Sequence, residues 1–278
     1  MYFVIGLIRL FVIRNLILLT LLLSAICVQG QIVGLTSAKV NSFTAYPIAT
    51  HYAELEPSFG TTISSRSWDN EGNLIDIGPD QAELGSGMCI RSAYVLTDAI
   101  EVACMVPTTV DFANFSMKYF LGGNEKNQYG LITGIRVPMG NKLLNKNERT
   151  LDEAMALGLG AIYSRTFSET FSLDVNLQYY DYLHSTIENH GNDLYLYADI
   201  GKYFADGQYQ WLNGISYINQ SFEDTNSYVF SWYPGFSIEV NPNLLFVMNF
   251  QLDLIGKNAP KTFGYGLAFT FTIHKPSN

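Results

Sequence analysis

Charged side chains are scarce in this 278-residue chain, and their spacing places several of them on a shared face. Asp, Glu, Lys and Arg make up 15% of the residues, against roughly 25% in soluble domains. Side chains alternate across a β-strand, so residues an even number of positions apart lie on the same face. On this basis the following charged residues are predicted to point into a common interior: Glu54, Arg91, Glu101, Lys118, Arg136, Asp174, Asp199, Glu239 and Asp253.

The two signs of charge are unevenly distributed over this interior. The basic residues Arg91, Lys118 and Arg136 all belong to the first half of the chain, whereas the later segments contribute acids alone. Charges set across a narrow passage would orient polar solutes, as charged side chains do in channels. Alternatively, opposite charges would pair across the interior and hold a filled barrel together. The sequence leaves both interpretations open.

Aromatic residues share the predicted inward face. An aromatic lining suits small apolar or aromatic solutes, but rings of this size also fill the interior of a small barrel. The residues concerned are Tyr52, Phe112, Phe120, Tyr180, Tyr182, Tyr195, Tyr197 and Tyr233.

No pattern in the chain indicates catalysis. A barrel hydrolase needs a Ser within hydrogen-bond reach of a His, which on one strand face means His-x-Ser, and this spacing is absent around the four histidines. No metal-binding or phosphate-binding motif is present either. We therefore predict a protein without enzymatic activity, catalytic residues, bound metal or cofactor. The net charge of −9 also argues against nucleic-acid binding.

The strands that would position these side chains are clearest in the last part of the chain. From Phe263 to Ile273, bulky apolar residues occupy every second position and Gly, Ala and Thr alternate with them. The same rhythm recurs along the chain, with tight turns alternating with longer loops such as 64–82 and 139–153. The predicted strands are 51–63, 83–96, 100–107, 112–121, 128–138, 156–167, 171–182, 193–204, 209–220, 228–238, 244–254 and 263–273.

The composition of the two faces predicts which one is turned outward. The polar faces carry mostly Gly, Ala, Ser, Thr, Asn and Tyr rather than the Lys and Glu of a water-exposed strand, and the apolar faces are dense in Phe, Tyr, Trp and Leu. Such an apolar face is typical of contact with lipid. We predict an all-β fold, a transmembrane antiparallel up-and-down β-barrel of about twelve strands in the outer membrane of a Gram-negative bacterium, with membrane lipid as its surroundings.

The N-terminal residues have the layout of an export signal. Arg9 and Arg14 precede an apolar run, and Val28-Gln29-Gly30 follows it, as in a signal peptide cut after residue 30. A lipoprotein signal at Cys27 and an uncleaved helical anchor are the alternatives. The predicted organisation is a signal peptide at 1–30, a periplasmic lead-in at 31–50 and the barrel at 51–278. A small plug that enters the barrel is the alternative for residues 31–50.

One hairpin resembles a known family. The run from Ala93 to Val102, Ala-Tyr-Val-Leu-Thr-Asp-Ala-Ile-Glu-Val, followed by Pro107, is similar to a hairpin of the outer-membrane family linked to the meta-pathway of phenol degradation. Residues 131–140 and 156–180 are similar to other strands of that family. The resemblance implies a transporter-like outer-membrane protein.

These observations lead to one functional prediction and two alternatives. The prediction is a passive channel for small solutes, with hydrophobic or aromatic solutes among the candidates. The first alternative is a closed structural barrel that binds partners through its long extracellular loops, and the second is an outer-membrane lipase. The sequence carries no signal for the oligomeric state.

Overall fold

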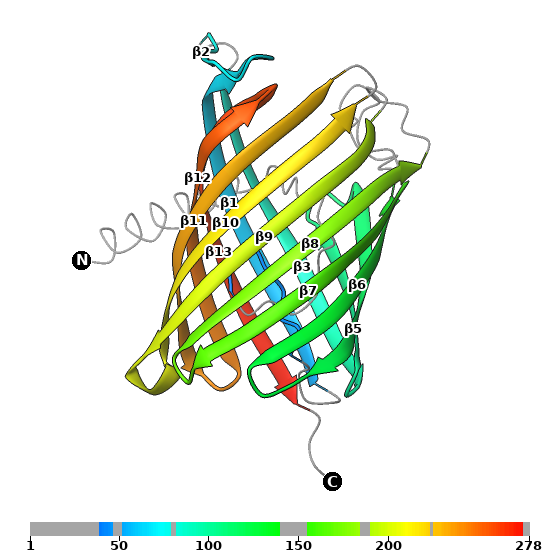
Figure 1. Cartoon of the computed structure of the whole chain (residues 1–278), viewed down its shortest axis with the longest axis vertical. Helices are drawn as coiled ribbons and strands as arrows, with labels where there is room; N and C mark the ends of the chain where they lie inside the picture. The colour runs from blue at the N-terminus through cyan, green and yellow to red at the C-terminus, as the bar shows by residue number, and fades with distance from the viewer. Residues whose placement is uncertain are drawn as a thin grey trace, which may run out of the picture.

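The computed structural model describes residues 39–46, 52–78, 82–139, 155–183, 190–222 and 225–274. These residues form twelve long antiparallel strands, each paired with its neighbours around a barrel, and a short strand β2 at one rim (Figure 1). Pairing of the last strand with the first closes the barrel. The strands are β1 Tyr52–Trp68, β2 Leu74–Asp76, β3 Glu83–Thr97, β4 Ile100–Pro107, β5 Phe112–Gly123, β6 Asn127–Pro138, β7 Met155–Ser168, β8 Phe171–Leu183, β9 His190–Phe204, β10 Tyr209–Phe222, β11 Asn226–Asn241, β12 Leu244–Lys257 and β13 Ala259–His274.

The predicted all-β, up-and-down barrel of twelve strands is confirmed. Every predicted strand is present, and the alternation that predicted it is visible in the burial of the side chains. In β4, for example, each second residue from Glu101 to Pro107 is buried and the residues between them are half-buried. Among the residues that the structure describes, no helix is long and apolar enough to cross a membrane.

The connections agree with the prediction at one end of the barrel and differ at the other. Tight turns follow β3, β5, β7, β9 and β11, as predicted. At the opposite end, the connections after β4, β10 and β12 are short as well, so the prediction of longer loops there is wrong for these three. β12 and β13 continue to Lys257 and Ala259, and a single residue, Asn258, joins them with a positive φ of 47°.

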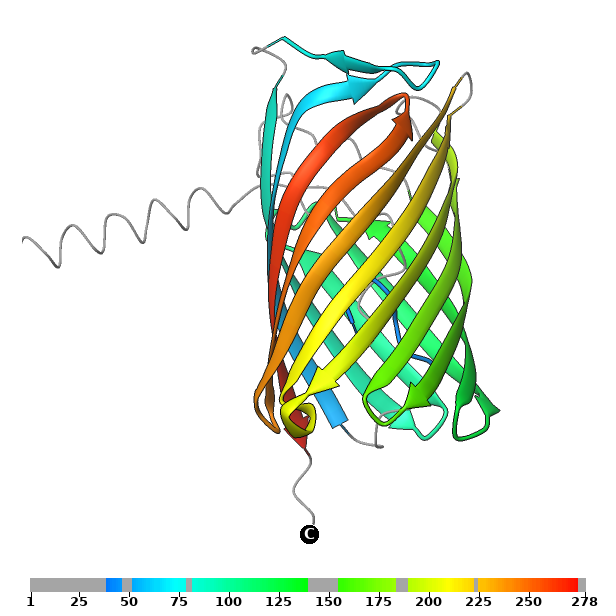
Figure 2. The ribbon, with the colours of Figure 1, turned by 60° about the vertical axis from the view of Figure 1, so that its left-hand side comes forward.

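The loop predicted at 64–82 is partly an extension of the barrel wall. β1 continues to Trp68, and its end pairs with β2 on one side and with β13 on the other, which raises this side of the rim (Figure 2). The turn between β1 and β2 is held by Asp69, whose carboxylate accepts hydrogen bonds from the backbone N–H of Asn73 and of Glu71, both at 2.8 Å. The hydrogen bonds from Asn73 and Glu71 lower the pKa of Asp69.

The outer surface of the barrel is apolar. Leu159 on β7 is 63% exposed, and Leu84 on β3 is 61% exposed. Aromatic rings gather on this surface near the tight turns, where Tyr129 and Tyr163 lie 5.4 Å apart between ring centroids. An apolar outer band with aromatic residues towards its edges is the surface of a barrel that spans a membrane.

A charge placed in the middle of this band should destabilise the barrel. Leu159 lies within β7, away from both ends, so Leu159→Arg should lower the free energy of unfolding by about 2–4 kcal/mol. The measurement is urea unfolding in lipid vesicles, with the shift in gel mobility between unheated and boiled samples reporting the folded fraction. Leu159→Phe is the matched control and should change little. A cost below about 1 kcal/mol for the Arg variant would contradict a lipid-facing Leu159.

Candidate functional site

The charged residues predicted to point inward lie on the inward-facing register. Glu54 is half-buried, and Glu239 is exposed close to the tight turn between β11 and β12. The other residues of this set are buried: Arg91, Glu101, Lys118, Arg136, Asp174, Asp199 and Asp253. Their predicted role in selecting solutes stays a prediction.

The first half of the barrel carries its own counter-charges. Arg91 on β3 contacts Glu54 at 3.1 Å and Glu56 at 2.9 Å, both on the neighbouring strand β1. Lys118 on β5 contacts Glu101 on β4 at 2.6 Å, and the two residues face each other in the strand register. We call this side, formed by β1, β3, β4 and β5, the self-paired wall. The basic residues lie where they were predicted, but adjacent acids offset their charge.

Arg136 is positioned differently from the other two basic residues. Its guanidinium carbon lies 3.8 Å from the centroid of the Phe112 ring on the neighbouring strand β5. Such stacking is favourable because the face of an aromatic ring is electron-rich. A residue predicted as part of the aromatic lining thus supports one predicted to carry charge.

The opposite side of the lumen brings carboxylates together. Asp174 on β8 and Asp199 on β9 face each other directly in the strand register, and both are buried. Asp193, also on β9, accepts hydrogen bonds from the hydroxyls of Tyr182 at 2.9 Å and Tyr195 at 2.5 Å. We call this side, with its three aspartates, the acidic wall. Asp193 was missed in the sequence although it lies an even number of residues from Asp199, so alternation alone would have found it.

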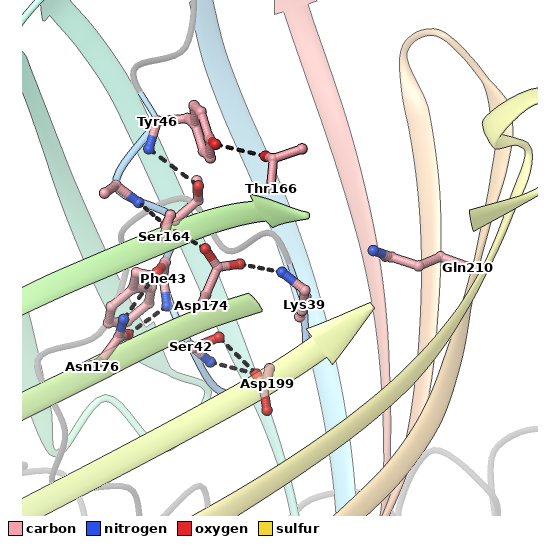
Figure 3. A network of polar contacts seen from close by, with 12 residues as sticks. Lys39, Ser42, Phe43, Tyr46, Ser164, Thr166, Asp174, Asn176, Asp199 and Gln210 are labelled. Carbon is pink, nitrogen blue, oxygen red and sulfur yellow. Dashed lines mark hydrogen bonds and ion pairs between the residues drawn. The ribbon is translucent and has the colours of Figure 1, made fainter. Parts of the chain in front are cut away.

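A segment from the N-terminal region lies against the acidic wall. Residues 39–46 precede β1 and lie inside the barrel (Figure 3). We call this segment the inner strap. The side-chain ammonium of Lys39 contacts the carboxylate of Asp174, with both side chains almost fully buried. A positive charge thus reaches the acidic wall from outside the strand ladder. The predicted organisation of the chain stays a prediction, and these eight residues of the segment 31–50 contact the inner wall of the barrel.

Asp199 holds the strap through one of its two carboxylate oxygens. Its Oδ2 accepts hydrogen bonds from the backbone N–H of Asn41 at 2.6 Å, from that of Ser42 at 2.7 Å and from the Ser42 hydroxyl at 2.9 Å (Figure 3). Two consecutive N–H groups on one carboxylate oxygen form a strong, charge-assisted contact. This contact fixes the strap opposite the Asp174 and Asp199 pair.

Further hydrogen bonds join the strap to β7 and β8. The Asn176 side chain accepts from the N–H of Phe43 at 2.5 Å and donates to its carbonyl at 3.0 Å. The N–H of Ala45 donates to the Ser164 hydroxyl at 2.8 Å, and the hydroxyl of Tyr46 contacts that of Thr166 at 2.6 Å. Most of these contacts use the backbone of the strap. They therefore depend more on its extended course than on its side chains.

Glycines in the wall make room for these contacts. A Cβ added at Gly201 would lie 2.9 Å from Cε of Lys39, and one added at Gly214 would lie 2.0 Å from Oδ1 of Asp199. Real Cβ atoms do not approach this closely, so larger residues at either position would displace a side chain that holds the strap. These inward glycines keep the space that the strap occupies.

A layer of aromatic and aliphatic side chains adjoins the strap. Phe43 and Ala45 join a buried cluster with Tyr180 on β8 and with Tyr195 and Tyr197 on β9, whose rings stack at 6.1 Å. Of the other predicted lining residues, Tyr52 and Phe120 are half-buried, and the buried ones are Phe112, Tyr182 and Tyr233. The rings lie on the predicted face, and in this layer they pack against the strap.

The buried pair on the self-paired wall predicts a non-additive effect on stability. Glu101→Leu would leave Lys118 buried without its carboxylate and should cost about 3–5 kcal/mol of unfolding free energy. The double variant Glu101→Leu/Lys118→Met should cost less, since no unpaired charge remains. The control is Asp76→Leu, which breaks the exposed pair of Arg66 and Asp76 and should cost at most about 1 kcal/mol. In urea unfolding, the pairing would be contradicted if the loss of unfolding free energy in the double variant equalled the sum of the losses caused by the two substitutions made singly.

Comparison with known proteins yields similarity at the level of fold. No family model matches the chain, and no curated protein matches it. Among solved structures, an outer-membrane channel from Pseudomonas putida F1 has a TM-score of 0.69 at 12% identity, covering 84% of this chain and 100% of that one. The NanC porin has a TM-score of 0.52 at 8% identity, covering 78% and 98%. The link to the meta-pathway family stays a prediction.

Proposed function

We propose that the chain is a passive channel for small solutes in the outer membrane of a Gram-negative bacterium. A closed barrel satisfies every backbone hydrogen bond within its ladder and can therefore reside in lipid. The apolar outer band and the signal-like residues 1–30 support this location, as does the likeness in fold to the Pseudomonas putida channel. The proposal assigns no catalysis and no cofactor to the chain.

One observation carries the proposal, namely that the charges of the self-paired wall are satisfied along that wall. Arg91 and Lys118 pair with acids of neighbouring strands, so these pairs do not tie the wall to the far side of the lumen. The acidic wall finds its counter-charge in Lys39 of the strap. In a barrel held shut by ion pairs between its walls, the basic residues of one wall would instead pair with the acids of the opposite wall. The solute path in this proposal runs between the strap and the self-paired wall.

The nature of the solute follows from the residues that face this path. The inward rings of Tyr52 and Phe120, which are half-buried, offer flat apolar surfaces, which suits small solutes with aromatic or apolar parts. The acidic wall brings the carboxylates of Asp174, Asp193 and Asp199 together, which favours cations over anions. A barrel of twelve strands is narrower than the porins of sixteen or more, so large solutes are excluded.

The second candidate function is a closed barrel that acts through its rim. The position of the strap inside the lumen favours this candidate, because Phe43 and Ala45 are buried against the wall. The raised rim at β1 and β2 would then be the binding surface. Conductance of the purified protein in a planar bilayer separates the two candidates, since a channel carries current and a closed barrel does not.

Ion selectivity tests the proposed path directly. Arg91→Ala would leave Glu54 and Glu56 without their basic partner, so the preference for cations should increase, and Arg136→Ala should act in the same direction. For an ion about 8 Å away at an effective dielectric constant of about 40, one charge contributes about 1 kcal/mol, or about fivefold in relative permeability. The measurement is the reversal potential across a salt gradient.

The matched control is Arg165→Ala, because Arg165 is exposed on the outer surface and stacks on Phe167. It should leave the reversal potential unchanged. A wild-type protein without current would contradict the channel. A current that is indifferent to Arg91 and Arg136 would contradict the assigned path and leave the channel itself intact.

A further inference from the structure

The acidic wall poses an electrostatic problem that the strap solves. Asp174 and Asp199 are opposite each other on adjacent strands and buried, and like charges in that arrangement destabilise a sheet. Lys39 contacts Asp174, and two backbone N–H groups and a hydroxyl reach Asp199. The strap thus serves as the counter-ion and hydrogen-bond donor for this pair.

The polar contacts of the strap can be exchanged for contacts with water. It takes no part in the twelve-stranded ladder, and its described polar contacts reach three strands on one side: β7 through Ser164 and Thr166, β8 through Asp174 and Asn176, and β9 through Asp199. Ion pairs and hydrogen bonds of this type are replaced by hydration when the groups separate. Detachment would therefore leave the barrel itself intact.

The docked strap also leaves buried polar atoms without partners. Among the described residues, Oδ1 of Asp199, Nδ2 of Asn41 and Nε2 of Gln210 have no hydrogen-bond partner. The Gln210 amide points towards Lys39 from β10 (Figure 3). Buried polar atoms that remain unpaired cost free energy that hydration would recover. This cost offsets part of the favourable binding of the strap.

We propose that the inner strap is a releasable plug that sets the conductance of the channel. In the docked state it fills the lumen beside the acidic wall and neutralises part of it through Lys39. On release, the lumen widens by the volume of the strap, and the Asp174 and Asp199 pair becomes a cation-binding step on the solute path. The inference rests on the proposed channel function and adds its regulation.

A disulfide lock tests the plug on the full-length protein. A Cβ at Gly130 would lie 3.8 Å from the Cβ of Ala45, which matches the mean Cβ separation of a disulfide, about 3.8 Å. The variant Ala45→Cys/Gly130→Cys should therefore tie the strap to β6 when oxidised. In planar bilayers its conductance should lie below that of the wild type, and dithiothreitol should restore it. Ala45→Cys and Gly130→Cys alone are the controls and should not respond to dithiothreitol in this way.

Two variants that should release the strap test whether its detachment increases the conductance. Asp199→Ala removes three hydrogen bonds to the strap, and Gly214→Ala keeps the carboxylate but displaces it. Loss of even one charge-assisted hydrogen bond should raise the released population about tenfold, so both variants should increase the open fraction by at least about that factor. Oxidation of the lock built into Asp199→Ala should cancel the increase. Glu169→Ala, which removes an exposed acid from the turn between β7 and β8, should behave as the wild type.

The outcomes separate the plug from the channel. Equal conductance of the wild type, the release variants and the oxidised lock would overturn the plug and leave the channel standing. A folded barrel, judged by gel mobility, in which the lock fails to form would overturn the docked position of the strap. The absence of current in every variant, Asp199→Ala included, would overturn the channel and the plug together.

Discussion

The placement of two carboxylates opposite each other inside a membrane barrel constrains the rest of this structure. Asp174 and Asp199 occupy facing positions on β8 and β9, with at most 2% of either residue exposed. Buried charges need partners, because the loss of hydration is expensive in a medium of low dielectric constant. The neighbouring strands supply no basic partner for this pair in the described contacts. A segment from outside the ladder supplies Lys39 and a row of N–H groups instead.

The opposite wall meets the same requirement within the sheet. Each acid of the pairs around Arg91 and Lys118 lies on the strand next to its base, and Thr270 on β13 adds a hydrogen bond to Glu56. Neighbours in a ladder are held at a fixed separation, so these pairs form as soon as the strands do. The lumen is therefore asymmetric. One wall is complete by itself, and the other is completed by the strap.

Alternation predicted the strands and the inward faces because both depend on spacing within a few residues. The parity that assigns Asp174 to the interior operates along a single strand, and hairpin pairing then fixes its neighbours. Contacts of the strap have no such local cause. The residues of the strap are 119 to 158 positions away in the sequence from the strand residues to which they are hydrogen-bonded. The sequence of the strap also shows no sustained alternation of apolar and polar residues. The rim was also missed, because Gly256, Asn258 and Pro260 interrupt the rhythm that marks β12 and β13 as strands.

The order in which these contacts form follows from the same distances. The strap precedes β1, yet its partners lie on β7, β8 and β9, so it has no binding surface until that wall exists. Long-range contacts of this kind form late, since closing a long loop costs entropy before any contact compensates for it. Each molecule therefore passes through a state in which the acidic wall is assembled and the strap is not yet docked. In that state water that enters the lumen solvates the carboxylates of Asp174 and Asp199, and docking of the strap replaces this water with Lys39 and backbone N–H groups.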